Sequence, residues 1–371
     1  MMIAEQSIST LPGCSIVIRA NNEEAHITRL LQGIHEQTIP EIEIILVDSG
    51  STDHTIEFAE RFIQNLNPPG VPDHRSNDTS RHPSPDAPSH RSNDFNRSTR
   101  VLHVIHIRPE DFTFGYALNQ GIAHASHALV VIASAHIYPV YPDWLERLLA
   151  PFADPQVALA YGKQRGNHTS HFAEGQIFHH WYPDRSQPRQ PYPFCNNANA
   201  AIRRSLWEKQ RYDETLPGLE DLEWGNRIMQ QGYAISYVAE AEIIHVHSET
   251  PRRVYNRYRR EAMAFKRIFP DERFHWWDAL RHFTANSLSD LTHAARQRQF
   301  ISHFWDILWF RWMQFWGTYQ GYRQPGQLTW QLRQTFYYPR GIVTGNQPPV
   351  RNIEPIRYNK LNGVVKSQDQ P

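Results

Sequence analysis

The sequence predicts an α/β fold in which helices flank a mainly parallel sheet. Short apolar runs rich in β-branched residues occur at 14–19, 42–48, 101–107 and 128–133, each bounded by polar or turn residues. Helical patterns lie between them, at 23–37 and at 53–66. Alternating strands and helices are typical of a buried parallel sheet with helices packed on its faces.

The composition is that of an ordinary globular protein with balanced charge. The 371 residues are 40% hydrophobic, enough to fill a sizeable core. Basic and acidic residues number 38 each, so no net charge indicates nucleic acid as a partner. The two cysteines lie far apart in the sequence, and the N-terminus lacks the basic and apolar pattern of a signal peptide. We therefore expect a cytoplasmic protein.

Changes in composition divide the chain into regions. Residues 1–250 carry the strand and helix alternation and are expected to form one domain. Within it, 67–100 is poor in aliphatic residues and contains HRSND twice, which predicts a disordered, low-complexity insertion. Residues 251–338 are dense in Arg, Trp, Phe and Tyr and predict a helical C-terminal region, followed by a disordered tail at 339–371.

The run FWDILWFRWMQFWGTYQGY, from Phe304, allows two interpretations. Its aromatic residues either pack against the rest of the protein or contact a membrane surface peripherally, at the inner face of the membrane. Asp306 and Arg311 interrupt the run before it reaches the ~20 apolar residues of a spanning helix. We expect that it does not cross a bilayer.

Polar residues follow the second predicted strand, in the segment LVDSGSTDHT. Asp48 stands at the carboxyl end of this strand, and Ser49 and Gly50 begin a tight turn. Ligands of open α/β sheets bind at such strand ends. Asp48 is therefore a candidate acceptor for a hydrogen bond from a base or a ribose.

Three segments together resemble the nucleotide-binding half of glycosyltransferase family 2, whose fold is called GT-A. They are SIVIRANNEE from Ser15, IEIILVDSGSTDHT from Ile42 and FTFGYALNQGIAHA from Phe112. The resemblance covers roughly 14–247 apart from the insertion. It implies a nucleotide-binding set of Arg19, Asn21, Glu23, Asp48, Ser49, Gly50, Gly115 and Asn119.

The family usually carries an Asp-x-Asp motif at the end of the fourth strand, where this chain has Ser134, Ala135 and His136. The two aspartates hold a divalent cation against the diphosphate. A hydroxyl and an imidazole still suit a borderline ion such as Mn²⁺, but they lack the charges that favour Mg²⁺. The resemblance places Ser134, His136 and His247 around the cation. In the alternative, His136 only satisfies a strand end.

His247 comes from IIHVHSETPRR, in which His245 and His247 share one face of an extended segment. Family members often supply a histidine from this region to the metal or the diphosphate. His247 is the stronger candidate because it lies nearer the expected end of the strand.

The segment LPGLEDLEWGNRIMQQG places Glu220 and Asp221 before a helical pattern, where the family has a Glu-Asp pair. The resemblance implies that Asp221 is the general base for the acceptor hydroxyl and that Glu220 positions the acceptor. Without this resemblance, a carboxylate at a helix start is often only a cap. Asn196 and Asn197 either line the acceptor site or form turn hydrogen bonds.

The resemblance implies an inverting enzyme that moves a sugar from a nucleotide-diphosphate sugar to a hydroxyl of a saccharide or lipid-linked acceptor. A non-catalytic nucleotide-sugar or glycan-binding module that has lost its metal site is the alternative. The Glu220–Asp221 pair favours the enzyme, because a binding module has little use for a base.

Overall fold

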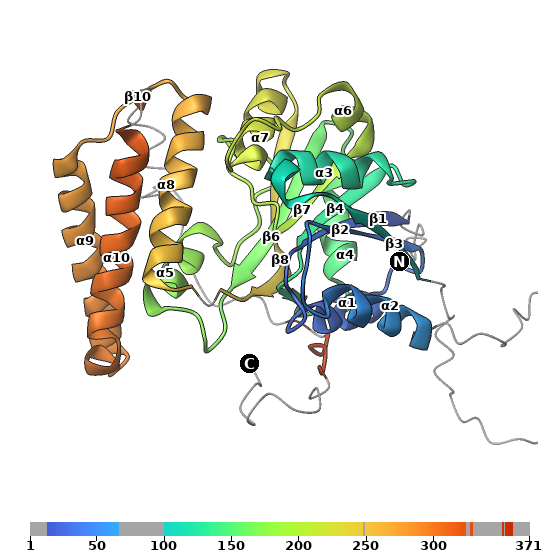
Figure 1. Cartoon of the computed structure of the whole chain (residues 1–371), viewed down its shortest axis with the longest axis horizontal. Helices are drawn as coiled ribbons and strands as arrows, with labels where there is room; N and C mark the ends of the chain where they lie inside the picture. Colours follow the sequence, from blue (N-terminus) through green and yellow to red (C-terminus); the bar gives the residue numbers. More distant parts are fainter. Residues whose placement is uncertain are drawn as a thin grey trace, which may run out of the picture.

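The structure, a computed structural model, describes residues 13–66, 100–247, 249–323, 327–328, 351 and 353–358 (Figure 1). The strands of the main sheet are β1 (Cys14–Ala20), β2 (Ile42–Asp48), β3 (Val101–His106), β4 (Leu129–Ser134), β5 (Ile137–Pro139), β6 (Val157–Arg165), β7 (Asn199–Arg203) and β8 (Ala234–His245). The α-helices are α1 (Ile27–His35), α2 (Thr55–Leu66), α3 (Phe114–Ala123), α4 (Trp144–Leu149), α5 (Phe172–Trp181), α6 (Arg204–Lys209), α7 (Glu220–Gln230), α8 (Pro251–Ile268), α9 (Trp276–Arg296) and α10 (Phe300–Tyr322).

The main sheet has the order β3-β2-β1-β4-β7-β6-β8-β5. β1 pairs in parallel with β2 and β4, and β6 pairs in parallel with β8. β7 is antiparallel to both β4 and β6, so β6 and β8 run in the same direction as β1. The predicted α/β fold with a mainly parallel sheet is confirmed, and the carboxyl ends of β1, β2, β4, β6 and β8 lie at one edge.

Helices cover both faces of the sheet, and each face has its own core. On one face α3 and α7 pack on the strands through residues such as Leu118 and Trp224. On the other, α1 and α4 do so through residues such as Leu30 and Trp144 (Figure 1). The apolar runs at β1, β2 and β4 are buried as predicted, whereas β3 is an edge strand whose first residue, Val101, is 45% exposed.

The C-terminal helices α8, α9 and α10 stand side by side beyond the β6 and β8 end of the sheet (Figure 1). α10 packs closely on α8 because Gly317 and Gly321 present no side chain there. A Cβ at Gly317 would lie 2.5 Å from the carbonyl oxygen of Tyr255, and one at Gly321 would meet the carbonyl oxygen of Arg259. None of the helices in the described part of the chain is both long and apolar enough to span a membrane.

Parts of the predicted insertion and tail can be placed. Residues 67–99 of the insertion lie outside the described residues, whereas Arg100 is buried and donates to the carbonyl oxygen of Pro40 at 2.8 Å. In the predicted tail, Arg351 and 353–358 are described and lie on the α/β domain. There Arg351 forms an ion pair with the buried Asp143 at 2.7 Å.

Candidate active site

The candidate site lies at the sheet edge where the parallel strands end. Arg19 comes from the end of β1, Asp48 from β2, Ser134 from β4 and His245 from β8. Residues that the sequence separates by more than two hundred positions therefore meet at one edge, as expected for ligand sites of open α/β sheets.

The loop after β2 is held by Asp48. Its buried carboxylate accepts from the backbone N–H of Gly50 at 3.2 Å and of Ser51 at 3.1 Å. Asn21 donates to the Ser49 carbonyl oxygen at 3.0 Å, which joins the loops after β1 and β2. Gly50 has φ +84°, a left-handed conformation that favours glycine. Three predicted nucleotide-binding residues thus lie in one turn at the strand ends, and a fourth, Asn21, binds it from the loop after β1.

Asn119, a predicted nucleotide-binding residue, uses its amide within the protein. Its Nδ2 donates to the Tyr212 carbonyl oxygen at 3.0 Å and to Glu214 Oε1 at 2.8 Å. Its Oδ1 accepts from Trp207 Nε1 at 2.8 Å and from the Tyr212 N–H at 3.1 Å. These four bonds use the full capacity of an amide. Asn119 therefore fixes the segment that leads towards Glu220, instead of offering groups to a ligand.

Gly115 has the same structural role as Asn119. A Cβ at this position would lie 2.5 Å from the Asp213 carbonyl oxygen, so the glycine lets the start of α3 contact that segment.

Glu220 and Asp221 begin α7 and form a buried acidic pair. Arg19 Nη1 donates to Glu220 Oε1 at 3.3 Å, and Asn197 Nδ2 donates to the same oxygen at 3.3 Å. Asp221 Oδ2 accepts from the Asn197 backbone N–H at 3.1 Å, and Oδ1 accepts from the Leu222 N–H at 2.8 Å. The pair thus meets Arg19, which lies 201 residues earlier in the sequence.

The surroundings of Asp221 raise its pKa to about 7. Burial is the largest cause because it disfavours the charged carboxylate, and the negative charge of Glu220 raises the pKa further. The two backbone hydrogen bonds and the charge of Arg19 act in the opposite direction. Asp221 can therefore exchange a proton near neutral pH, as a general base requires.

Three histidines form a second cluster at the same edge. The ring centroid of His136 lies 5.1 Å from that of His245 and 5.6 Å from that of His247, and the last two are 4.1 Å apart. One ring nitrogen from each lies within 4.8 Å of the other two. His136 and His247 therefore meet as predicted, and His245 joins them. Ser134 ends β4 two residues before His136.

Each histidine is oriented through its Nδ1. The partners are Glu23 Oε1 for His136, Gln164 Oε1 for His245 and Glu174 Oε1 for His247, each at 2.8 Å. Burial, followed by neighbouring positive charges, holds the pKa of His245 and of His247 well below the usual value. Both rings are therefore neutral, the form that binds metal ions.

Glu23, a predicted nucleotide-binding residue, contacts the His136 ring in this structure. Among the residues that sequence reasoning missed, His245 had a signal, since the His-x-His spacing puts both rings on one face. Arg260 had none. Its guanidinium lies 4.8 Å from the Phe114 ring centroid, and that of Arg19 lies 4.9 Å from the same centroid. α8 thus brings a second cation against the same ring as Arg19, whose Nη1 binds Glu220.

The two acceptor-side asparagines differ. Asn196 Oδ1 accepts from the Ala198 N–H at 2.9 Å, which is the turn hydrogen bond that the sequence left as an alternative. Asn197 is buried and binds both members of the acidic pair. Asn197 thus orients the carboxylates, so its backbone and side chain act within the site.

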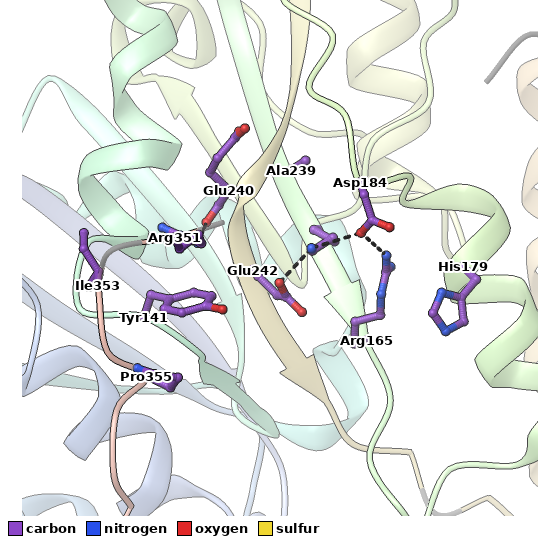
Figure 2. Close-up of a pocket in the computed structure, with 11 residues that line it drawn as sticks. Tyr141, Arg165, His179, Asp184, Ala239, Glu240, Glu242, Arg351, Ile353 and Pro355 are labelled. Atoms are coloured by element: carbon purple, nitrogen blue, oxygen red, sulfur yellow. Dashed lines mark hydrogen bonds and ion pairs between the residues drawn. The ribbon is translucent and has the colours of Figure 1, made fainter. Parts of the chain in front are cut away.

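A cavity of about 520 Å³ lies on the face of β6 and β8 opposite to the histidine cluster (Figure 2). Lys163 lines it and points away from the His245 side of the sheet, because its neighbour Gln164 faces His245 and successive side chains of a strand alternate. Lys163 pairs with Glu242 at 2.7 Å, and Arg165 pairs with Asp184 at 2.9 Å. The charged groups that line the cavity therefore already neutralise one another. The Glu220–Asp221 pair and the three histidines do not line it.

Comparisons with known proteins agree with this geometry. Residues 15–78 match the family described as glycosyl transferase family 2, and residues 95–264 match the one described as glycosyltransferase like family 2. The O-antigen chain rhamnosyltransferase WbaN of Salmonella anatum is 24% identical over 260 residues, which cover 67% of this chain and 70% of WbaN. The O-antigen chain rhamnosyltransferase RfbN of Salmonella typhimurium is 24% identical over 255 residues, which cover 66% and 69%.

Among solved structures, the mannosyltransferase PcManGT from Pyrobaculum calidifontis, in complex with GDP-Man and Mn²⁺, is similar with a TM-score of 0.52. It is 19% identical, and the match covers 84% of each chain. This likeness concerns the fold, whereas the family matches concern the sequence itself. Across residues 15–78 and 95–264 the chain is therefore a glycosyltransferase of family 2, built on the GT-A fold.

Proposed function

We propose that the protein is an inverting glycosyltransferase in which Asp221 takes the proton from the acceptor hydroxyl. The buried Glu220–Asp221 pair carries this proposal. Arg19 and Asn197 both donate to Glu220 Oε1, which fixes that carboxylate. Asp221, with its pKa raised to about 7, is the member of the pair that is able to take up a proton.

The hydrogen bonds of Asp221 leave it free to act. Each of its oxygens accepts one backbone N–H, whereas a carboxylate offers about four acceptor positions. An acceptor hydroxyl can therefore donate to Asp221 without displacing either bond. These bonds also fix the direction of the carboxylate, which places the acceptor oxygen for attack.

Inversion follows from the use of one base. In-line attack by the acceptor oxygen on the anomeric carbon needs a group that removes a proton and a leaving group that departs on the opposite side. A retaining double displacement needs a protein nucleophile as well. Glu220 is a poor candidate for that nucleophile because its carboxylate is tied to Arg19 at 3.3 Å.

The donor is a nucleotide-diphosphate sugar. In this proposal the turn at Asp48 and Gly50 receives the nucleoside, and Arg19 and Arg260, which both lie against the Phe114 ring, meet the diphosphate. Because both relatives are rhamnosyltransferases, nucleotide-linked rhamnose is the first donor to test.

A divalent cation, Mn²⁺ or Mg²⁺, completes the proposed donor site. Ser134, His136 and His247 are the predicted ligands, and the imidazole nitrogens fit such an ion. When bound, the cation stabilises the negative charge of the departing diphosphate. Glu23 and Glu174 hold two of the imidazoles in place through Nδ1.

The acceptor is a saccharide or a lipid-linked saccharide, as the O-antigen chain transferases among the relatives suggest. Helices α9 and α10 support the lipid-linked choice, because they expose tryptophan and aliphatic side chains. We place the protein in the cytoplasm, in peripheral contact with the inner face of the membrane through these helices.

The stereochemistry of the product tests this proposal. The protein would be incubated with dTDP-, UDP- and GDP-linked sugars, rhamnose among them, and with simple glycoside acceptors, and the anomeric configuration of the product would be read by NMR. We expect transfer from one nucleotide, with the configuration opposite to that of the donor. A retained configuration would contradict the one-base mechanism. Tight nucleotide binding without transfer from any donor would favour the non-catalytic module.

A further inference from the structure

We propose that His136, His245 and His247 together bind one transition-metal ion through their Nε2 atoms, in the absence of nucleotide. The inference deepens the proposed function. It depends on that function only for the expectation that the donor's diphosphate lies beside the ion. The Asp-x-Asp motif of the family holds its cation through carboxylates, whereas this site would use three imidazoles. The ligand set and the choice of ion are therefore properties of this chain.

The fold forces the three rings together. β5 follows His136 directly and runs antiparallel to β8, so that Ile137 lies opposite His245. The backbone N–H of Val246 donates to the His136 carbonyl oxygen at 3.1 Å, which extends this pairing past the end of the strand. Backbone hydrogen bonding therefore holds His136 beside the His-Val-His segment at 245–247. One nitrogen of each ring comes within 4.8 Å of the others.

The acceptors on Nδ1 decide which nitrogen carries a lone pair. Glu23 and Glu174 are carboxylates, and a carboxylate only accepts hydrogen bonds, so Nδ1 of His136 and of His247 must carry the proton. Gln164 Oε1 is likewise an acceptor for His245 Nδ1. In neutral imidazoles the lone pair then lies on Nε2, which is the arrangement of histidines that ligate metals.

His245 supplies an independent sign of a missing partner. Its side chain is 5% exposed, and its Nε2 is fully buried without a hydrogen-bond partner in the described structure. A buried nitrogen that has no hydrogen-bond partner is unfavourable. A cation contacted by this lone pair removes that cost, whereas an anion would meet three lone pairs and be repelled.

Arg257 acts on the outer side of the cluster. Its Nη1 lies 3.4 Å from His247 Nδ1, farther than Glu174 Oε1 at 2.8 Å, and its Nη2 pairs with Glu174 at 3.0 Å and with Glu249 at 2.8 Å. Glu174 and Glu249 therefore already neutralise a guanidinium. They support the His247 ring and are not free to hold a second ion.

The ligand chemistry selects the ion. Imidazole suits Zn²⁺, Co²⁺ and, less tightly, Mn²⁺, whereas Mg²⁺ prefers oxygen ligands and keeps much of its water. Three protein ligands leave at least one coordination position for water or for a diphosphate oxygen. We therefore expect the nucleotide-free protein to bind Co²⁺ and Mn²⁺ but not to bind Mg²⁺ at the same concentration.

Titration of the full-length, nucleotide-free protein with CoCl₂ tests this inference, because Co²⁺ bound by nitrogen ligands gives visible absorption bands. We expect one Co²⁺ per chain. His245→Ala and His136→Ala should each weaken its affinity at least ~10-fold and change the bands. His124→Ala, which removes an exposed histidine outside the cluster, should leave the titration unchanged.

The outcomes separate this inference from the proposed function, because the titration contains neither donor nor acceptor. Binding of Co²⁺ by His245→Ala with the wild-type affinity and spectrum would remove His245 from the site. If that variant does not fold, His136→Ala, whose side chain is 28% exposed, serves as the test. Binding by the wild type only after a nucleoside diphosphate is added would overturn the claim of a nucleotide-free site, while transfer and its stereochemistry would still be open to measurement.

Discussion

At the residue scale, the two carboxylates of the acidic pair have different surroundings. Leu219, just before the pair, has φ 55° and ψ 30°, a left-handed conformation that is uncommon for a branched side chain. Such strain is often retained at functional sites. Here it turns the chain into α7 so that Glu220 faces Arg19 while Asp221 lies against Asn197. The negative charge of Glu220 thus raises the pKa of Asp221.

This coupling predicts a pH profile. A base must be deprotonated, so kcat/KM should rise with pH through about 7, the raised pKa of Asp221. Glu220→Gln removes the adjacent negative charge and should move the midpoint down by about one pH unit. Glu223→Gln is the control, since Glu223 lies on the same helix but pairs with Arg227. An unchanged midpoint in Glu220→Gln would show that the pair is not coupled as described.

Some residue roles could be predicted from sequence and others could not. Motif position was enough to identify Asp221 and His136 as site candidates, because the surrounding segments resemble a known family. The role of Asn119 depends on Tyr212 and Glu214, more than ninety residues away, which a local pattern does not reveal. Motif position likewise assigned Glu23 to the nucleotide. Its contact with His136, 113 residues away, could not be read from a local pattern either.

At the scale of elements, α10 explains both interpretations of the aromatic run. Phe310 and Phe315 are buried, and Arg311, which interrupts the run, forms a buried ion pair with Asp290 of α9 at 2.7 Å. The other side carries Ile301, Trp305, Trp312 and Trp316, which are exposed and share one face at helical spacing. The run therefore packs with one face and presents the other to its surroundings.

The charge around the exposed face supports the proposed membrane contact. Between Trp276 and Tyr322 the exposed charged residues are Arg281, Arg296 and Arg298, all of them basic. The acids Asp278 and Asp290 of α9 are buried. Exposed tryptophans beside arginines are typical of a surface that lies on anionic lipid, with each arginine contributing ~1 kcal/mol at low salt.

Vesicle sedimentation checks this surface. We expect the protein to bind vesicles that contain phosphatidylglycerol, less so at high salt, and not to bind pure phosphatidylcholine. The double substitution Ile301→Ala and Trp305→Ala removes side chains that are 90% and 75% exposed and should weaken binding about tenfold. Val101→Ala, an exposed apolar residue on the edge strand, is the control. Vesicle binding unaffected by the double substitution would exclude this face.

At the scale of the whole molecule, the sequence was most informative where burial is continuous. β1, β2 and β4 are buried, so their apolar runs could be recognised without knowledge of their neighbours. The antiparallel strand β5 is only three residues long, and the meeting of His136 with His245 depends on its pairing with β8. A short strand gives little periodicity, which is why sequence alone did not bring all three histidines together.

The turnover of Asp221→Asn tests the central claim most directly, namely that the buried acidic pair supplies the base for sugar transfer. The amide keeps the shape of the carboxylate but does not take up the proton. With the donor and acceptor that the wild type uses, we predict a loss in kcat of at least ~10²-fold. Calorimetric binding of the nucleoside diphosphate should stay nearly unchanged. Wild-type turnover in Asp221→Asn would contradict the account and remove Asp221 from the mechanism.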